Sequence, residues 1–338
     1  MVWGSLPVIK VSPEGTVIVY QASEAPVPVQ PVGIHWTNPF LAIRICSFSK
    51  AANNLVPPTG FNKDLMMSTC QERLQCALGI AREAGDLTLR YFRATNYATE
   101  IKPDATPVTQ ADREAELLLR ERIAAAFPED EILGEEFPSR PGTSGYRWIL
   151  DPLDGTKSFI RGVPLYGTLV AVEYLGQFEI GVIYIPATEE CVYAARGQGA
   201  WYTNGKGPEQ PARVSDCQDL SQALLLTTDI AHFRQIGRPE VWSQLASRVA
   251  LTRTWGDCYG YLLVATGRAE IMIDPIVSLW DAAALLPILE EAGGHLTDWN
   301  GERRLDSGSI VATNDKLFQA VLEITGGNTS RSRGPLLR

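Results

Sequence analysis

The strongest constraint on the fold of this chain is a regular alternation of helix-like and strand-like segments between residues 69 and 325. In the helix-like segments apolar residues recur every three to four positions, and in the strand-like segments they form short runs or alternate with polar residues. Several hairpin turns and no internal repeat predict a layered α/β (α+β) sandwich, in which helix layers alternate with sheet layers. The expected helices begin near residue 69 and cover about 109–127, 239–249, 258–266, 279–292 and 315–324; the expected strands are 131–134, 147–150, 168–174, 178–185, 191–195, 223–227, 251–255, 269–273, 295–298 and 309–312.

Two helix ends carry local signals. Thr69 and Glu72 have the spacing of a capping box, which predicts that the first helix starts there. Pro128 cannot continue a helix, so the second helix is expected to stop at residue 127. Residues 197–207 are rich in turn-forming residues and predict a link between strands.

Composition divides the chain into three parts. Proline recurs without a helical period before residue 66, so residues 1–65 are expected to be a flexible or non-native N-terminal extension. The absence of acidic residues from 28 to 63 leaves a targeting segment open. One compact domain is expected over residues 66–325, with an N-terminal part to about 207 and a C-terminal part from about 208. Residues 326–338 are rich in Gly, Ser and Arg and predict a disordered tail.

Charge and composition argue against several classes of protein. A net charge of −9 and a pI near 5.0 disfavour a nucleic-acid-binding protein. No uncharged apolar run approaches the ~18 residues of a membrane span, so no membrane partner is expected. The six scattered cysteines form no paired motif and fit a cytoplasmic protein, and the three widely separated histidines disfavour a histidine-based metal cage.

An apolar strand runs directly into two carboxylates, Asp151 and Asp154. Pro152 cannot donate to a sheet and Gly155 permits a tight turn, so both carboxylates and the Leu153 carbonyl can face one point. Hard divalent cations prefer this mixture of carboxylate and carbonyl oxygens. A strand-ending turn capped by an aspartate side chain is the structural alternative.

Further acidic residues lie at the ends of other predicted elements. Glu135 directly follows the short strand 131–134, which again puts carboxylates at a strand end. Asp281 lies in the first turn of a long apolar helix, and Asp112 lies at the start of the second helix. For both aspartates the alternative is a structural one, because a negative charge at a helix N-terminus is favourable.

Together these motifs resemble the inositol monophosphatase family of magnesium-dependent, lithium-sensitive phosphatases. Four elements stand in the family's order: a Thr-x-x-Asp pattern ending at Asp112, a Gly-Glu-Glu pattern around Glu135, the segment Asp151–Thr156, and a Trp-Asp-Ala-Ala pattern around Asp281. The match covers about residues 70–325. It implies the phosphatase fold of this family, a small phosphorylated substrate, and two to three Mg²⁺ ions with inhibition by Li⁺.

The resemblance also implies roles for individual residues. Asp112 and Thr156 match the pair that orients and deprotonates the attacking water, and Glu135 would share a third, weaker ion that carries this water. Bound cations would relieve the repulsion within such an acidic site and neutralise the phosphoryl oxygens. The implied metal ligands are Glu135, Asp151, the Leu153 carbonyl, Asp154 and Asp281.

Other residues resemble the histidinol-phosphate phosphatase branch of the family. After Thr156 the chain continues with Lys157, Ser and Phe, where relatives that cleave inositol phosphates typically read Thr-Asn-Phe. Asp257 stands where those relatives have a small residue, and a carboxylate suits the amino group of histidinol phosphate. Arg253 matches the family's substrate-contacting arginine, and the backbone N–H groups of Gly155, Thr156 and Lys157 are expected to meet the phosphate.

Several of these residues have structural alternatives. Asp257 could be the N-cap of the helix 258–266, a role that can coexist with substrate binding, and Lys157 could be a solvated surface lysine. His232 is interpreted as a structural or surface residue. Three aromatic residues could either wall an imidazole pocket or pack in the core: Trp255, Tyr259 and Tyr261.

We therefore expect a Mg²⁺-dependent phosphomonoesterase that converts L-histidinol phosphate to L-histidinol in histidine biosynthesis, as a cytoplasmic homodimer. The alternatives within the family are a phosphatase for inositol 1-phosphate or sugar phosphates and a nucleotide 3′-phosphatase. A non-catalytic regulator would be expected to have lost part of the acidic set, and all of its members are present.

Overall fold

The computed structural model describes residues 63–326, apart from 95–96, 104–105 and 206, together with two short strands near the N-terminus. The chain divides into two compact units, Met1–Thr59 and Gly60–Arg338. The expected N-terminal extension and C-terminal tail lie almost wholly outside the described residues, so both stay predictions.

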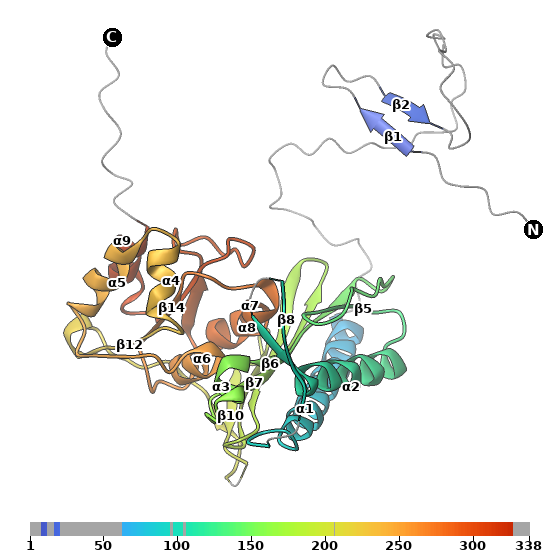
Figure 1. Ribbon diagram of the computed structural model, residues 1–338, viewed down its shortest axis with the longest axis horizontal. Coiled ribbons are helices and arrows are strands. Elements are labelled where there is room, and N and C mark those ends of the chain that lie inside the picture. The colour runs from blue at the N-terminus through green and yellow to red at the C-terminus, as the bar shows by residue number, and fades with distance from the viewer. Residues whose placement is uncertain are drawn as a thin grey trace, which may run out of the picture. The chain divides into compact units, whose positions relative to one another are not determined.

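In the first unit, β1 (Val8–Val11) and β2 (Val17–Tyr20) form an antiparallel pair. The second unit contains the remaining described elements (Figure 1). Its helices are α1 (Lys63–Thr88), α2 (Gln110–Ala126), α3 (Thr156–Ile160), α4 (Ile230–Gln235), α5 (Pro239–Ala246), α6 (Asp257–Ala265), α7 (Leu279–Ala283), α8 (Leu285–Glu291) and α9 (Phe318–Thr325), with a short 3₁₀ turn at Leu220–Gln222. Its strands are β3 (Thr99–Ile101), β4 (Pro107–Thr109), β5 (Glu131–Gly134), β6 (Tyr146–Asp154), β7 (Gly167–Tyr174), β8 (Gln177–Ile185), β9 (Glu190–Ala195), β10 (Ala200–Thr203), β11 (Gln210–Pro211), β12 (Leu224–Leu226), β13 (Leu251–Arg253), β14 (Ile271–Asp274), β15 (Gly294–Thr297) and β16 (Ile310–Asn314).

Two large sheets organise the second unit. The seven-stranded sheet has the order β11-β10-β9-β8-β7-β6-β5, with β5 parallel to β6 and the other neighbours antiparallel. The five-stranded sheet has the order β13-β12-β14-β16-β15, with β12 parallel to both of its neighbours. The short strands β3 and β4 form a separate hairpin before α2.

Buried apolar side chains fill the spaces between helices and sheets. α1 and α2 cover one face of the seven-stranded sheet, where Ala81 and Leu119 pack with Trp148. α6, α7 and α8 form the middle layer with the other face of that sheet and with one face of the five-stranded sheet. α5 and α9 cover the far face of the five-stranded sheet through Val241 and Val321. This order of layers confirms the predicted layered sandwich.

The first helix begins earlier than predicted. α1 starts at Lys63, so the capping box expected at Thr69 and Glu72 is wrong, and Thr69 lies inside the helix. The Thr69 hydroxyl is instead hydrogen-bonded to the Tyr146 hydroxyl in β6, at 3.1 Å. Glutamate also favours helix interiors, so the spacing alone does not distinguish a cap from a helical turn.

Other differences arise later in the chain. The helix expected over residues 279–292 is divided into α7 and α8, because Pro287 has no N–H to donate to the carbonyl of Ala283 four residues earlier. The expected link 197–207 contains β10, which pairs with β9, and α4 was not predicted. β6 extends four residues beyond the predicted strand, to Asp154.

The junction between α7 and α8 packs directly against Gly181 of β8. A Cβ atom at Gly181 would lie 2.0 Å from the Ala284 carbonyl oxygen, whereas a Cβ at Gly79 on the surface of α1 would meet nothing within 4 Å. We therefore expect Gly181→Ala to lower the free energy of unfolding by about 1–3 kcal/mol. Gly79→Ala should raise it by up to about 1 kcal/mol. Urea unfolding of both variants measures the two effects, and equal stabilities would contradict the close packing.

Candidate active site

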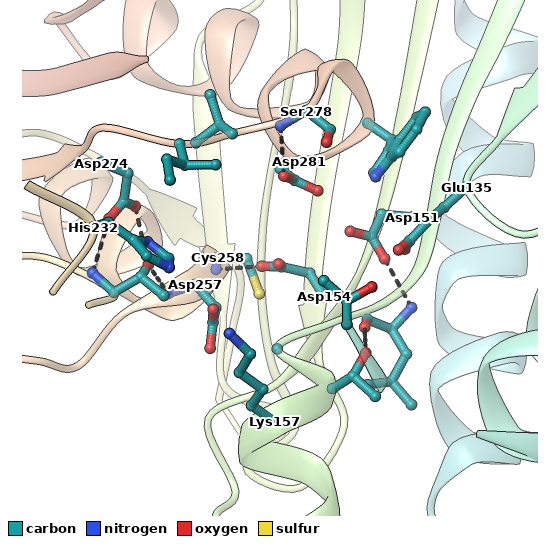
Figure 2. Close-up of a pocket in the computed structure, with 18 of the residues that line it drawn as sticks. Glu135, Asp151, Asp154, Lys157, His232, Asp257, Cys258, Asp274, Ser278 and Asp281 are labelled. Carbon is teal, nitrogen blue, oxygen red and sulfur yellow. Dashed lines mark hydrogen bonds between the residues drawn. The ribbon is translucent and has the colours of Figure 1, made fainter. Parts of the chain in front are cut away.

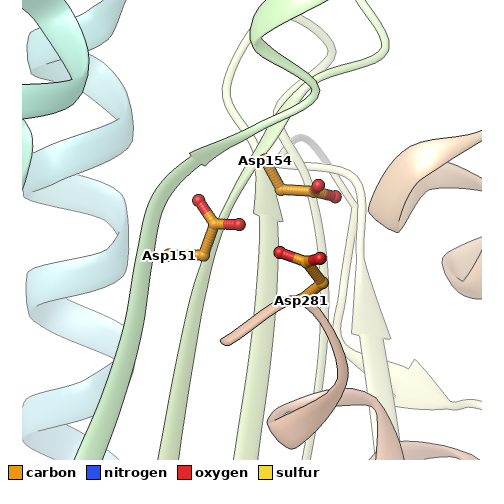
Figure 3. A group of neighbouring side chains, drawn as sticks. All are labelled: Asp151, Asp154 and Asp281. Atoms are coloured by element: carbon orange, nitrogen blue, oxygen red, sulfur yellow. The ribbon is translucent and has the colours of Figure 1, made fainter. Parts of the chain in front are cut away.

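Three carboxylates from two segments of the chain converge at the end of β6. Asp151 and Asp154 belong to β6, whose register against β7 shifts between these two residues, and Asp281 lies in the first turn of α7. One oxygen of each side chain lies within 4.8 Å of the others. Figure 3 shows the three carboxylates turned toward one another. Residues three apart in a regular strand point to opposite faces, so the irregularity in β6 brings both of its carboxylates to one point.

Each of these carboxylates is held by a backbone N–H group. The bonds join Asp151 to the Leu153 N–H (3.0 Å), Asp281 to the Ser278 N–H (2.7 Å), and Asp154 to the Cys258 N–H. The bond to Ser278 completes a capping box at the start of α7, so the structural role expected for Asp281 and its place in the cluster coexist.

The cluster carries strong electrostatic strain. Burial and the neighbouring carboxylates raise the pKa of Asp151 and of Asp154 well above the usual aspartate range, and burial raises the pKa of Asp281 to about 6. A divalent cation among these oxygens would compensate both the repulsion and the lost hydration. The carboxylates and the adjacent Leu153 carbonyl are hard oxygen donors, so the residues fit such an ion.

Glu135 lies beside the cluster, directly after β5. Burial raises the pKa of its carboxyl to about 7, although the Lys102 ammonium acts in the opposite direction. The Nζ atom of Lys102 lies 2.7 Å from Oε1 of Glu135 and 2.6 Å from Oε1 of Glu136. Lys102 therefore balances part of the acidic charge. No sequence motif predicts this contact, because Lys102 lies in the loop between β3 and β4.

Asp112 and Thr156 also meet, as expected. The Thr156 hydroxyl lies 3.0 Å from Oδ1 of Asp112 and 3.2 Å from the Leu153 carbonyl oxygen. The other oxygen of Asp112 accepts hydrogen bonds from the N–H (2.8 Å) and the hydroxyl of Thr109, the N-cap of α2. One aspartate thus caps a helix and holds a hydroxyl beside the cluster, and burial raises its pKa.

The carboxylates open into a pocket of about 830 Å³ (Figure 2). Gly155, Thr156 and Lys157 line it at the start of α3, and Asp257 lines it at the start of α6. Glu135, Asp151, Leu153, Asp154 and Asp281 line the same pocket. Most of the predicted site residues therefore share one cavity.

Asp257 does not cap α6. The N-cap is Gly256, and Asp257 itself has a positive φ of 51°. Its carboxylate reaches α3, where it accepts a hydrogen bond from the Ser158 hydroxyl at 3.3 Å. Burial raises its pKa to about 7, while the charge of Lys157 acts in the opposite direction. The structural alternative for Asp257 is thus wrong, and its side chain faces the pocket.

Arg253 is not brought into the pocket. It lies at the end of β13, where its guanidinium donates to the Thr252 carbonyl (2.7 Å) and lies 5.8 Å from the centre of the Trp255 ring. Trp255 is 40% exposed and does not line the pocket. Of the three aromatic residues considered, Tyr261 lines the pocket and donates to Asp274 at 2.8 Å, whereas Tyr259 packs in the middle layer.

Sequence reasoning also missed other residues of the pocket wall, among them Thr228, His232 and Asp274. Asp274 is buried at the end of β14 and accepts hydrogen bonds from Thr228 and Tyr261. His232 was interpreted as a structural or surface residue, but it lines the pocket from α4, and its Nδ1 is buried without a hydrogen-bond partner among the described residues. For Asp274 the sequence did contain a signal, because this acidic residue directly follows the predicted strand 269–273.

Comparison with known proteins is consistent with this site. Residues 70–326 match the model of the inositol monophosphatase family. The histidinol-phosphatase of Chlorobaculum parvum is 44% identical over 77% of this chain and 98% of its own length, and that of Mycobacterium tuberculosis is 39% identical over 74% and 96%. The crystal structure of the extragenic suppressor protein suhB from Bartonella henselae superposes with a TM-score of 0.70 at 28% identity, covering 76% of this chain and 99% of that one.

The chain belongs to the inositol monophosphatase family, whose members are metal-dependent. The resemblance drawn from the four motifs is thereby confirmed. Among the described residues, none of the helices is long and apolar enough to cross a membrane.

The raised pKa values predict how pH affects the metal-free protein. Folded-state pKa values of about 6 for Asp281 and about 7 for Glu135 and Asp257 exceed the unfolded values near 4. The folded state therefore binds more protons between about pH 4 and 7, and its stability falls as pH rises through this window. In chelator, the melting temperature of the wild type should fall over this range relative to that of Asp154→Asn, which lacks one repelling charge. If the melting temperatures of the two proteins changed equally with pH across this window, the prediction would be contradicted.

Proposed function

We propose that this chain is a Mg²⁺-dependent phosphatase that hydrolyses L-histidinol phosphate to L-histidinol. The observation that carries the proposal is the Asp257 carboxylate, which lines the same pocket as the acidic cluster. A substrate with a phosphate at one end and an ammonium group at the other suits a pocket with a cation site and a separate carboxylate. The similarity to two histidinol-phosphatases supports the same substrate.

In this proposal Asp151, Asp154, Asp281, Glu135 and the Leu153 carbonyl hold two to three Mg²⁺ ions. When bound, these ions would neutralise the phosphoryl oxygens and make the attacking water more acidic. Carboxylate and carbonyl oxygens are the ligands that Mg²⁺ prefers, and the sharing of one acidic cluster between ions explains why so many carboxylates are buried together.

Asp112 and Thr156 orient and deprotonate the attacking water. The Thr156 hydroxyl has one proton, and when it points to Oδ1 of Asp112 (3.0 Å) its lone pairs are left to accept a hydrogen bond from the water. The proton can then pass through the hydroxyl to Asp112. Burial raises the pKa of Asp112 and so makes its carboxylate a better proton acceptor than an exposed aspartate.

The two ends of the substrate are bound by different residues. Gly155, Thr156 and Lys157 meet the phosphate with backbone N–H groups and the lysine ammonium. Asp257 pairs with the substrate ammonium, which would also return the raised pKa of this carboxyl toward its usual range. Arg253, which lies outside this pocket, has no role in the proposal.

Inositol 1-phosphate is the second candidate substrate, because the matching family model describes inositol monophosphatases. Inositol has no ammonium group to pair with Asp257, so we expect inositol 1-phosphate to be a poorer substrate than histidinol phosphate. The homodimer and the cytoplasmic location expected from the sequence stay predictions.

A phosphate-release assay tests the reaction. With Mg²⁺ present, we expect turnover of histidinol phosphate to exceed that of inositol 1-phosphate, fructose 1,6-bisphosphate and 3′-phosphoadenosine 5′-phosphate. Activity should vanish in excess chelator, return with added Mg²⁺, and fall in millimolar Li⁺. Undiminished turnover in chelator would overturn the metal mechanism, and a preference for inositol 1-phosphate would overturn the substrate.

Replacement of Asp257 tests the assignment of the ammonium site. Asp257→Asn keeps the size of the side chain but removes its charge, and a charge-assisted contact is worth roughly 1.5–3 kcal/mol. We expect kcat/KM for histidinol phosphate to fall on the order of 10- to 150-fold. For inositol 1-phosphate the change should be small. Equal losses on both substrates would show that Asp257 maintains the pocket without reading the ammonium group.

A further inference from the structure

One buried carboxylate near the acidic cluster belongs to none of the roles described above. Glu116 lies on α2, four residues after Asp112, and its side chain is 0% exposed. Residues four apart lie on the same face of a helix, so both carboxylates point from α2 toward the seven-stranded sheet. A buried carboxylate is costly unless charge and hydrogen bonds compensate it, and Glu116 therefore needs a reason to be there.

Its partners are backbone groups of the segment that follows Glu135. Oε2 of Glu116 accepts a hydrogen bond from the Glu136 N–H at 2.6 Å, and Oε1 lies 3.3 Å from the Phe137 nitrogen. Arg120 completes the contact from the next turn of α2: its Nε donates to Oε1 of Glu116 at 2.6 Å, and its Nη2 donates to the Phe137 carbonyl at 2.8 Å. The pair holds both the N–H and the carbonyl of one residue.

On the N-terminal side of Glu135, the backbone of Gly134 packs against the Glu116 side chain. A Cβ atom on Gly134 would lie 2.1 Å from Oε1 of Glu116, so only glycine lets the carboxylate lie against the backbone at this point. Glu135 thus lies between Gly134, which packs against the Glu116 carboxylate, and Glu136, whose N–H donates to it. Its side chain, by contrast, faces Lys102 and the cluster.

We propose that Glu116 is a positioning residue, which fixes the backbone on both sides of Glu135 so that the Glu135 carboxylate meets the metal site. The inference rests on the proposed role of Glu135 as a metal ligand. Because Asp112 lies on the same helix, Glu116 also fixes the distance between the Asp112–Thr156 pair and Glu135. Residues that orient metal ligands commonly contribute 10- to 100-fold to metal affinity, roughly as much as a hydrogen bond to a charged group can supply.

Direct binding of Mn²⁺ measures this role without any substrate, since Mn²⁺ accepts the same oxygen ligands as Mg²⁺. The test variant is Glu116→Gln, which keeps the length of the side chain but loses one acceptor oxygen. The matched control is Asp130→Asn. Asp130 is likewise buried and is held by Arg73, Ser144 and Trp148, and none of its side-chain hydrogen bonds among the described residues reaches the segment around Glu135.

We expect Glu116→Gln to raise at least one Mn²⁺ dissociation constant by about 10-fold or more, as followed by electron paramagnetic resonance of free Mn²⁺. The Mg²⁺ concentration for half-maximal phosphate release should rise in parallel, while the KM for substrate at saturating Mg²⁺ stays near the wild-type value. Asp130→Asn should lower the melting temperature and leave Mn²⁺ binding unchanged.

Gly134→Ala provides a second variant in case Glu116→Gln folds poorly. Its added methyl group would displace the Glu116 carboxylate, and the same loss of Mn²⁺ affinity is expected. Wild-type affinity in either folded variant, or an equal loss in Asp130→Asn, would overturn the inference. If the wild type binds Mn²⁺ but does not hydrolyse histidinol phosphate, the proposed substrate fails and the role of Glu116 is still decided by the variants.

Discussion

The mutual repulsion of the carboxylates at the end of β6 is the constraint on which the rest of this site depends. Asp151, Asp154 and Asp281 bring oxygens within 4.8 Å of one another, with Asp151 buried and the other two partly buried. Such a cluster opposes folding unless other interactions hold it. The surrounding structure supplies them as backbone N–H groups from a strand, a helix start and a loop, one for each carboxylate.

Layering explains how these interactions come from such distant parts of the chain. The middle layer of helices packs between the two sheets, so the N-termini of α6 and α7 meet the end of β6 from one side. α2 approaches from the other face of the seven-stranded sheet and brings Asp112 to Thr156. The site is therefore a meeting point of element ends, where N–H groups without helical partners are available to hold negative charge.

Several residues serve the fold and the site at once. Asp112 completes a capping box with one oxygen and accepts a hydrogen bond from the Thr156 hydroxyl with the other, and Asp281 both completes a capping box and belongs to the acidic cluster. Asp257 adopts a positive φ and turns its carboxylate to α3 instead of capping its own helix. A backbone conformation of this kind is unfavourable for a residue other than glycine, and it is kept here because the surrounding contacts fix it.

The amino-acid sequence by itself determined the order of the elements, the layered fold and the acidic motifs, because periodicity and helix or strand ends are local properties of the chain. It was wrong at the start of α1, where the Thr69–Glu72 spacing lies inside the helix, and at the division between α7 and α8, where Pro287 interrupts the helical hydrogen bonds. Tertiary structure alone decided the pairing of Lys102 with Glu135, the arrival of His232 at the pocket, and the burial of Glu116 against Gly134. These contacts join residues far apart in the chain, and no local spacing encodes them, since they exist only when the sheets and helices have packed.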